Sequence, residues 1–226
     1  MSGSIWAVVP VKSLGHVKQR LAPALSQSAR DRLMLVMFED VMAVLQQLDE
    51  IDTVLVVTPD AYVAQIAAGL GAEVLEETER RGHSAAVVAG FARARAEGAS
   101  HAVTLPADAP LMTAQEIRAL LAYAPATDTL GVTLVPNREG EGTNAILATP
   151  PDAFVPSFGL GSLMRHRSLA AESGIPCTVI ELPGVAMDVD DPGDLMRLMA
   201  AKRNDPRYAF LDAHCASTFK ATVQIP

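Results

Sequence analysis

Uninterrupted apolar runs that each lead into a helical segment constrain the fold of this chain more than any other feature. Residues 5–11 form a β-branched run that ends in a polar loop, and an amphipathic stretch follows at about residues 28–48. The order repeats, because the apolar run 53–60 precedes an alanine-rich helical segment, 61–70, that ends at Gly71. Wholly apolar strands are typical of a parallel sheet covered on both faces. The sequence therefore predicts a single three-layer α/β domain whose ligands bind beyond the carboxyl ends of the strands.

Two further apolar segments, residues 130–137 and 142–149, flank a turn rich in glycine and glutamate. We expect them to pair as an antiparallel insertion in a mostly parallel sheet. No repeat or linker suggests a second domain, so residues 1–202 are predicted to form one domain. Hydrophobic periodicity weakens from Arg203 onward, and residues 203–226 are predicted to be a C-terminal tail that is mobile or used in oligomer contacts.

Charge and cysteine content limit the partners of the chain. A formal net charge of −8 argues against a nucleic-acid partner, because such proteins need a surplus of lysine and arginine. The two cysteines form no CxxC pair and indicate neither a disulfide framework nor a zinc site. The apolar run 5–11 is too short to span a membrane and has no basic segment before it. We therefore expect a cytoplasmic protein without a membrane partner.

Three aspartates follow predicted strands. Asp108 lies in LPADAP, and Asp188 and Asp190 lie in MDVDDPGD, where the spacing of two directs both side chains to one side of an extended segment. Carboxylates brought together at one sheet edge repel each other, and a hard divalent ion relieves that repulsion. The sequence thus predicts a magnesium site. The alternative is that these residues are turn or helix-capping residues, a role that Asp191 before Pro192 is expected to have.

Basic side chains cluster in and after the first strand-to-helix loop, where they could meet phosphate groups: Lys12, Lys18 and Arg20. Each of them taken singly could equally be a solvated surface residue. The chain lacks both the GxxxxGK[ST] and the GxGxxG patterns, which argues against P-loop kinases and hydride-transfer enzymes.

Two glycine-containing segments could hold an anion. GTN at residues 142–144 offers a hydroxyl and an amide, and SFGLGS at residues 157–162 leads into a predicted helix whose free N–H groups favour a phosphate or carboxylate. Ordinary turn chemistry and an N-cap role for Ser162 are equally good explanations. His83 and His166 have no spacing that pairs them with a nucleophile, so we expect surface or hydrogen-bonded structural histidines.

The ordered segments VPVKSLG with KQRLA, LPADAPL, GTNAIL, SFGLGS and MDVDDPGDL resemble the CofC/FbiD family of phospho-acid guanylyltransferases, over about residues 5–195. The resemblance implies a nucleotide-binding domain of the glycosyltransferase-A type, like that of nucleotide-diphospho-sugar transferases. It also implies an enzyme of coenzyme F420 biosynthesis that transfers GMP from GTP to a small phosphorylated carboxylic acid and releases pyrophosphate.

The same resemblance implies roles for individual residues. It implies catalytic Mg²⁺ ligands at Asp108, Asp188 and Asp190, and binding of the GTP phosphates by Lys12, also assigned a catalytic role, with Lys18 and Arg20. Contacts with the acceptor acid are implied for Thr143, Gly159 and Ser162. The nucleotide loop falls on Gly82, His83 and Ser84, but it reads RRGHSAA where a loop rich in glycine and asparagine is expected. The chain therefore departs from the family pattern at the place where the base is implied to bind.

The sequence leaves three matters open. The acceptor could be 2-phospho-L-lactate, phosphoenolpyruvate or 3-phospho-D-glycerate, since these acids differ only in details that a pocket must read. The rival functions are nucleotidyl transfer to another acceptor, such as a molybdopterin or sugar phosphate, and a non-catalytic GTP-binding module. The oligomeric state is also open, with a homodimer as one candidate.

Overall fold

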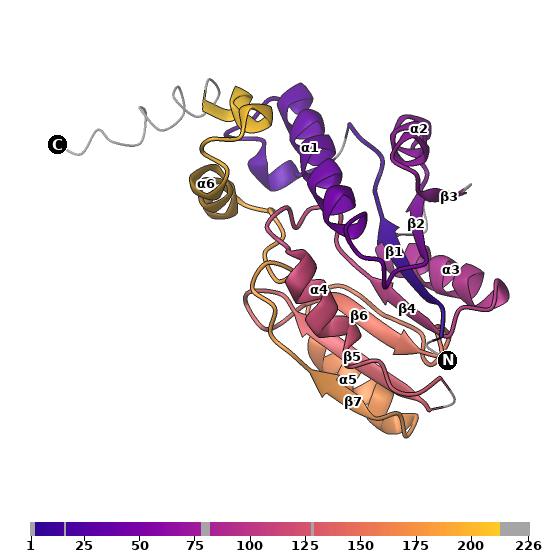
Figure 1. The fold of residues 1–226 in the computed structure, drawn as a ribbon. Coiled ribbons are helices and arrows are strands. Elements are labelled where there is room, and N and C mark those ends of the chain that lie inside the picture. Colours follow the sequence, from indigo (N-terminus) through magenta and orange to yellow (C-terminus); the bar gives the residue numbers. More distant parts are fainter. Residues whose placement is uncertain (1–2, 16, 78–81, 128, 213–226) are drawn as a thin grey trace.

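The computed structural model of this chain describes residues 3–15, 17–77, 82–127 and 129–212. These residues form one seven-stranded sheet that runs from β3 at one edge to β7 at the other (Figure 1). In sheet order the strands are β3 (Glu73–Glu76), β2 (Thr53–Thr58), β1 (Ile5–Pro10), β4 (His101–Thr104), β6 (Thr143–Thr149), β5 (Gly131–Pro136) and β7 (Cys177–Val179).

The sheet is parallel on one side and mixed on the other. Strands β3, β2, β1 and β4 are parallel, with Val8 of β1 opposite Leu55 of β2 and Thr104 of β4. Strand β6 runs antiparallel to both β4 and β5, and β7 is parallel to β5. The predicted antiparallel pairing of residues 130–137 with 142–149 is confirmed. Because β6 is reversed, its first residues lie at the same edge as the carboxyl ends of β1 and β4.

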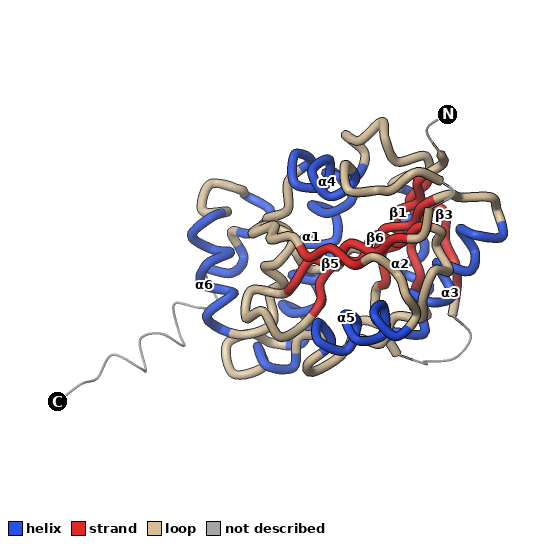
Figure 2. The backbone as a smooth tube through the Cα atoms, turned by 90° about the horizontal axis from the view of Figure 1, so that it is seen from below, coloured by secondary structure: helices blue, strands red, loops and turns tan. Residues whose placement is uncertain are grey.

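Alternate residues of β1 belong to two different cores. Ala7 and Val9 pack into the core beneath α1, α2, α4 and α6, while Trp6 and Val8 pack into the core beneath α3 and α5. Figure 2 shows strands β5 and β6 between α4 and α5. The predicted three-layer α/β arrangement is confirmed. The helices are α1 (Gln27–Leu45), α2 (Ala61–Gly69), α3 (His83–Ala96), α4 (Ala114–Leu121), α5 (Ser162–Glu172) and α6 (Pro192–Ala201), with short 3-10 helices η1 (Gln19–Leu21) and η2 (Pro206–Tyr208).

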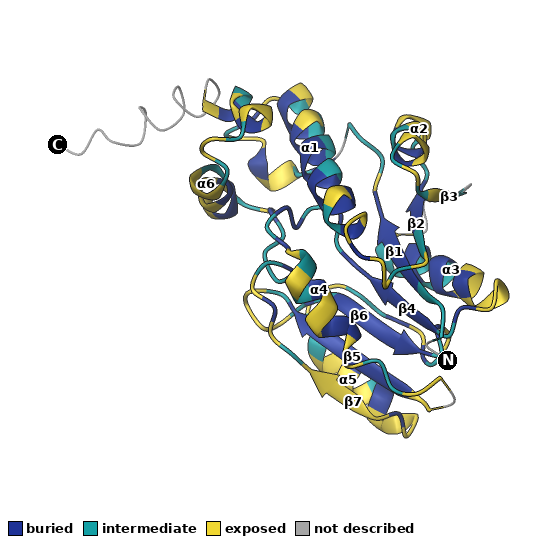
Figure 3. Ribbon diagram, in the orientation of Figure 1, coloured by how far each residue is buried: buried dark blue, intermediate teal, exposed yellow. Residues whose placement is uncertain are grey.

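Burial follows this layering. The central strands are buried, whereas β7 and the outer side of α5 are exposed (Figure 3). Among the described residues, no helix combines the length and the apolar character needed to cross a membrane.

Helix α3 packs closely on β1 at Gly90. A Cβ atom added at Gly90 would stand 2.4 Å from Cγ1 of Val8. We expect Gly90→Ala to lower the free energy of unfolding by ~1–3 kcal/mol, because the added methyl group overpacks the interface. Urea denaturation would measure this change.

Gly69, the last residue of α2, is the matched control for Gly90. Its added Cβ would meet nothing within 4 Å, and its φ is not positive. Gly69→Ala is expected to be neutral or to stabilise by up to ~1 kcal/mol, because it reduces the entropy of the unfolded chain. Equal losses in the two variants would contradict the close α3–β1 contact.

The first part of the predicted tail packs against the domain. Tyr208 and Leu211 are buried in the core that contains α1. The buried carboxylate of Asp40 on α1 lies 2.6 Å from Nζ of Lys202 and 2.5 Å from a guanidinium nitrogen of Arg207, and it accepts a 3.0 Å hydrogen bond from the Tyr208 hydroxyl. The boundary after residue 202 stays a prediction, but residues 203–212 are part of the packed structure, and residues 213–226 lie outside the described ranges.

We expect Asp40→Asn to destabilise the protein by ~1–3 kcal/mol, because two cations and a buried hydroxyl lose their shared anionic acceptor. Chemical denaturation monitored by circular dichroism would measure the loss. Asp49→Asn, at an exposed position just beyond α1, should change stability by less than ~0.5 kcal/mol. If both variants behaved alike, the Asp40 contacts would not hold residues 203–212 in place.

Candidate active site

A cavity of about 940 Å³ opens at the carboxyl ends of β1 and β4 and the start of β6. Ten of the predicted site residues line it, and Gly82, which caps α3, does not. Segments distant in the sequence meet here because parallel strands end at one edge of the sheet. The lining residues that were predicted are Lys12, Lys18, Arg20, Ser84, Asp108, Thr143, Gly159, Ser162, Asp188 and Asp190.

Lys18 connects two of the three aspartates. Its ammonium group forms ion pairs with Asp108 and, at 2.8 Å, with Oδ1 of Asp190. The side chain is only 4% exposed. Although burial by itself lowers it, the charges of Asp108 and Asp190 hold the pKa of Lys18 above its ordinary value. Lys18 is therefore charged and acts as the counter-ion of this pair of carboxylates.

The backbone around Lys18 is unusual as well. Its φ is 52°, which makes it the single non-glycine residue of the described ranges with a positive φ. Such a conformation costs about 1 kcal/mol or more, and it persists where surrounding contacts impose it. It places Lys18 directly before η1 with its side chain turned into the site.

Asp188 has no such counter-ion. Its Oδ1 accepts a 3.0 Å hydrogen bond from the amide of Asn144, and within the described residues it forms no ion pair. Burial, together with the nearby charge of Asp108, raises the pKa of Asp188 to about 6. The ordinary side-chain value is 3.8, so the folded protein disfavours the ionised form of Asp188 in the absence of a bound cation.

The DVD segment has the predicted alternation. Val189 is fully buried and packs into the core, while Asp188 and Asp190 line the cavity. The backbone N–H of Val189 donates to the carbonyl of Asp108 across 3.1 Å, which joins this segment to the one that follows β4. The three aspartates therefore lie in adjoining segments. In the described part of the chain, however, no three His, Cys, Asp or Glu side chains are close enough to ligate one ion as they stand.

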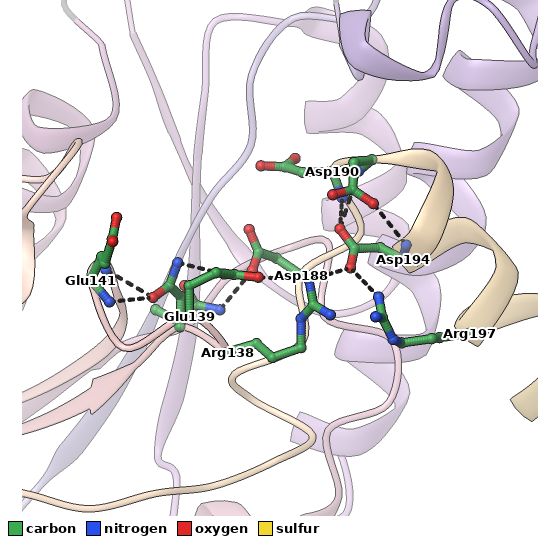
Figure 4. Close-up of polar contacts among 11 residues, drawn as sticks. Arg138, Glu139, Glu141, Asp188, Asp190, Asp194 and Arg197 are labelled. Atoms are coloured by element: carbon green, nitrogen blue, oxygen red, sulfur yellow. Dashed lines mark hydrogen bonds and ion pairs between the residues drawn. The ribbon is translucent and has the colours of Figure 1, made fainter.

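Asp194 holds the start of α6 in place. Its carboxylate accepts hydrogen bonds from the backbone N–H groups of Asp190 and Asp191, at 3.2 and 3.1 Å. It also lies 3.1 Å from guanidinium nitrogens of both Arg138 and Arg197 (Figure 4). Asp191 caps α6, as expected, through a capping box with Asp194. Asp194 and Arg138 were not among the residues predicted from the sequence, although an acidic residue three positions after a cap is the signal for such a box.

The cations differ in their partners. Lys12 and Arg20 are exposed at the mouth of the cavity, and neither forms an ion pair within the described residues. Lys18 is already ion-paired with two aspartates. Lys12 and Arg20 can thus meet an anionic ligand without breaking an ion pair to any described residue.

The lining of the same cavity includes residues of the two predicted anion-binding segments. The backbone N–H of Thr143 donates to Oγ of Ser162 across 2.9 Å, and the side chains of both residues are buried. Ser162 is not an N-cap: Gly161, with φ 67°, holds that position, and Ser162 begins α5. The positive φ of Gly159 and Gly161 lets the 157–161 loop turn tightly.

The segment around His83 meets the 157–161 loop. Oγ of Ser84 accepts a 2.9 Å hydrogen bond from the backbone N–H of Phe158. The rings of His83 and Phe158 stand edge to face with centroids 4.6 Å apart. His83 also lines the cavity; its spacing had predicted a surface or structural histidine, whereas the family resemblance had placed it in the nucleotide loop. His166 is buried and hydrogen-bonded, as expected.

Comparison with known proteins shows which family the chain belongs to. Residues 5–218 match the family described as guanylyl transferase CofC like. The chain belongs to this family. It is 39% identical over 203 residues to phosphoenolpyruvate guanylyltransferase of Conexibacter woesei, covering 88% of this chain and 91% of that protein. It is 35% identical to 3-phospho-D-glycerate guanylyltransferase of Colwellia psychrerythraea, over 83% of this chain and 88% of that protein.

The fold agrees with that membership. A putative nucleotide-diphospho-sugar transferase from Desulfovibrio desulfuricans G20 superposes with a TM-score of 0.74 over 96% of this chain and 97% of its own, at 15% identity. The likeness therefore extends over the whole domain. This CofC-family chain is a nucleotidyltransferase with the predicted fold class.

Proposed function

We propose that this protein transfers GMP from GTP to the phosphate of a small three-carbon phospho-acid, with release of pyrophosphate. The observation that carries the proposal is the meeting of two groups of residues in one cavity. The first, the carboxylate wall, is the cluster of three aspartates with Lys18, and the second is the buried Thr143–Ser162 pair with the glycine turn. The first group suits a divalent ion with the phosphate chain of a nucleotide, and the second suits an anionic acceptor.

A divalent ion, Mg²⁺ in this proposal, suits the carboxylate wall. Asp108, Asp188 and Asp190 offer oxygen ligands, and the uncompensated charge at Asp188 is what a hard cation would neutralise. When bound, Mg²⁺ would stabilise the negative charge that develops on the phosphate oxygens. Among the described residues, no three carboxylates are close enough to ligate one ion in their present positions. To hold Mg²⁺, the side chains of these three aspartates would therefore have to move toward it.

The remaining residues bind and orient the substrates. We assign the triphosphate to Lys12, Lys18 and Arg20, the nucleoside to the segment with Gly82 and Ser84, and the acid to Thr143, Gly159 and Ser162. An oxygen of the acceptor phosphate then attacks the α-phosphorus in line, a new P–O–P bond forms, and the bond to pyrophosphate breaks. A phosphate monoester is already nearly dianionic at neutral pH, so no protein base is needed and catalysis is positioning with charge stabilisation.

Among the three candidate acids we place phosphoenolpyruvate first, because the Conexibacter woesei relative bears that name at the higher identity. A cytoplasmic setting belongs to the same proposal, since the exposed thiol of Cys177 suits a reducing compartment. A homodimer stays a prediction that light scattering would check.

The test is pyrophosphate release from the purified protein with Mg²⁺, GTP and each acid in turn, with the product identified by mass. Release with one acid and a product heavier by GMP is expected. ATP, CTP and UTP in place of GTP test the choice of base, and preference for another nucleotide would overturn guanine recognition. If no acid led to pyrophosphate release although GTP binding was measured, transfer to this class of acceptor would be overturned.

A further inference from the structure

His166 on α5 is fully buried beside the 157–161 loop, and both ring nitrogens are hydrogen-bonded. The backbone N–H of Ser157 donates to Nε2 across 2.9 Å, and Nδ1 lies 2.9 Å from Oγ1 of Thr143. The rings of Phe154 and Phe158 stand edge to face with the imidazole, with centroids 5.8 and 5.1 Å away. These contacts hold the ring in one orientation.

The contacts also determine the tautomer of His166. A backbone N–H can only donate, so Nε2 must present its lone pair to Ser157. In the neutral ring Nδ1 therefore carries the proton and donates it to Oγ1 of Thr143. Burial, and then the charge of Arg165, lowers the pKa of His166 to about 4, so the ring is neutral near pH 7.

This tautomer determines the direction of the Thr143 hydroxyl. Because Oγ1 accepts from His166, its own proton must point to a different acceptor, and Thr143 lines the cavity. Ser162 is arranged in the same way, since its Oγ accepts from the backbone N–H of Thr143 and its proton is likewise left for another group. Two buried hydroxyl groups at the cavity wall are thus preset as donors, which suits an anion.

We propose that His166 is a positioning residue for the acceptor acid: as the Nδ1–H tautomer it fixes the Thr143 hydroxyl as a donor toward the ionised acceptor and anchors the 157–161 loop through Ser157. This assignment rests on the function proposed above. His166 itself does not line the cavity. The proposal predicts that acceptor binding is lost selectively when the Nδ1–H donor is removed by substitution.

Two amide substitutions separate the functions of the ring nitrogens. In His166→Asn the amide NH₂ group stands close to the place of Nδ1–H and can still donate to Thr143, while the acceptor for Ser157 is lost. In His166→Gln the amide reaches the place of Nε2 and can accept from Ser157, while the donor to Thr143 is lost. His101→Gln is the control, because His101 is also buried and hydrogen-bonded, to Thr149 across 2.8 Å, but lies away from the cavity.

We expect His166→Gln to raise the KM for the acid by about tenfold or more, because one hydrogen bond to a charged group is lost. The KM for GTP should stay within about twofold, and His166→Asn should raise the KM for the acid clearly less than His166→Gln. His101→Gln should lower the melting temperature without altering either KM. An unchanged acid KM in His166→Gln, equal increases of both KM values, or a larger effect of Asn than of Gln would each overturn the proposal.

Nitrogen-15 NMR of the imidazole in the unmodified protein gives a readout that a merely packing role would not require. A neutral ring protonated at Nδ1 at pH 7 is expected, and the Nε2–H tautomer or an imidazolium ion would overturn the assignment. If the unmodified protein transferred GMP to none of the acids, that result would overturn the proposed function. Calorimetric affinities of each acid for the three variants would then still decide the positioning role, and no difference between His166→Gln and the unmodified protein would reject it.

Discussion

Replacing Asp188 by asparagine should reduce guanylyl transfer by about 10³-fold, because a neutral amide is a poor ligand for a hard cation and leaves the transition-state charge less stabilised. The fold should survive, since asparagine has the same size and its carbonyl oxygen can still accept from Asn144. Steady-state pyrophosphate release gives the rate, and Mn²⁺ titration followed by electron paramagnetic resonance gives the affinity for a divalent ion.

Asp191→Asn is the matched control for Asp188→Asn. Asp191 lies in the same segment but caps α6, a role that asparagine also performs well. We expect a loss of less than about threefold in rate for this variant. A rate close to that of the unmodified protein in Asp188→Asn would remove Asp188 from the catalytic assignment.

The same substitution should make the metal-free protein more stable at neutral pH. The pKa of Asp188 is raised to about 6 in the folded state, so the folded protein holds this proton more tightly than the unfolded chain does. Stability is therefore lost as pH rises from about 4 to about 6, and the deficit persists above pH 6. Asp188→Asn should remove it, with a gain of up to ~2 kcal/mol at pH 7 and none at pH 3.5. Denaturation in the presence of a chelator would measure stability as a function of pH. An equal gain in stability at pH 7 and pH 3.5 would show that the raised pKa of Asp188 is not the cause.

Lys18→Met should lower the rate of transfer by about 10²-fold or more, the second largest effect expected. The substitution removes the cation that pairs with Asp108 and Asp190 and a donor proposed for the triphosphate. The three carboxylates then lose the lysine that is ion-paired with two of them. The metal-free melting temperature should fall, and Mg²⁺ should raise it by more than it does in the unmodified protein.

Lys18→Arg is the companion variant, because it keeps the charge and changes only shape and donor geometry. It should lose less activity than Lys18→Met and should show little extra stabilisation by Mg²⁺. If Lys18→Met responded to Mg²⁺ no more strongly than the unmodified protein, Lys18 would not be the counter-ion of the carboxylate wall.

The division of the fold into elements was predictable because it depends on short-range patterns. The apolar run at residues 5–11 predicted β1, and the apolar run at residues 53–60 predicted β2, which ends at Thr58 because Asp60 caps α2. The antiparallel pair was predictable from two apolar segments across a glycine-rich turn. The aspartates could be placed at one edge because strands of a parallel sheet end together.

The side-chain partners at the site were not predictable. Lys18 could be placed near phosphates, but its ion pairs join residues 90 and 172 positions apart. Ser162 was expected to cap a helix or touch a ligand; it does not cap α5, and its Oγ accepts a hydrogen bond from the backbone of Thr143. The histidine that orients Thr143 lies 23 positions from it and has no motif around it.

The sequence by itself determined the α/β order, the family and the set of residues that could carry the chemistry, because hydrophobic periodicity and strand-end position are properties of local segments. Only the tertiary structure decided which carboxylate lacks a counter-ion, which tautomer His166 adopts and which hydroxyl protons face the cavity. Those properties depend on distances of 2.8–2.9 Å between groups on different elements and loops. Such distances are set by how the layers pack, and no local pattern encodes them.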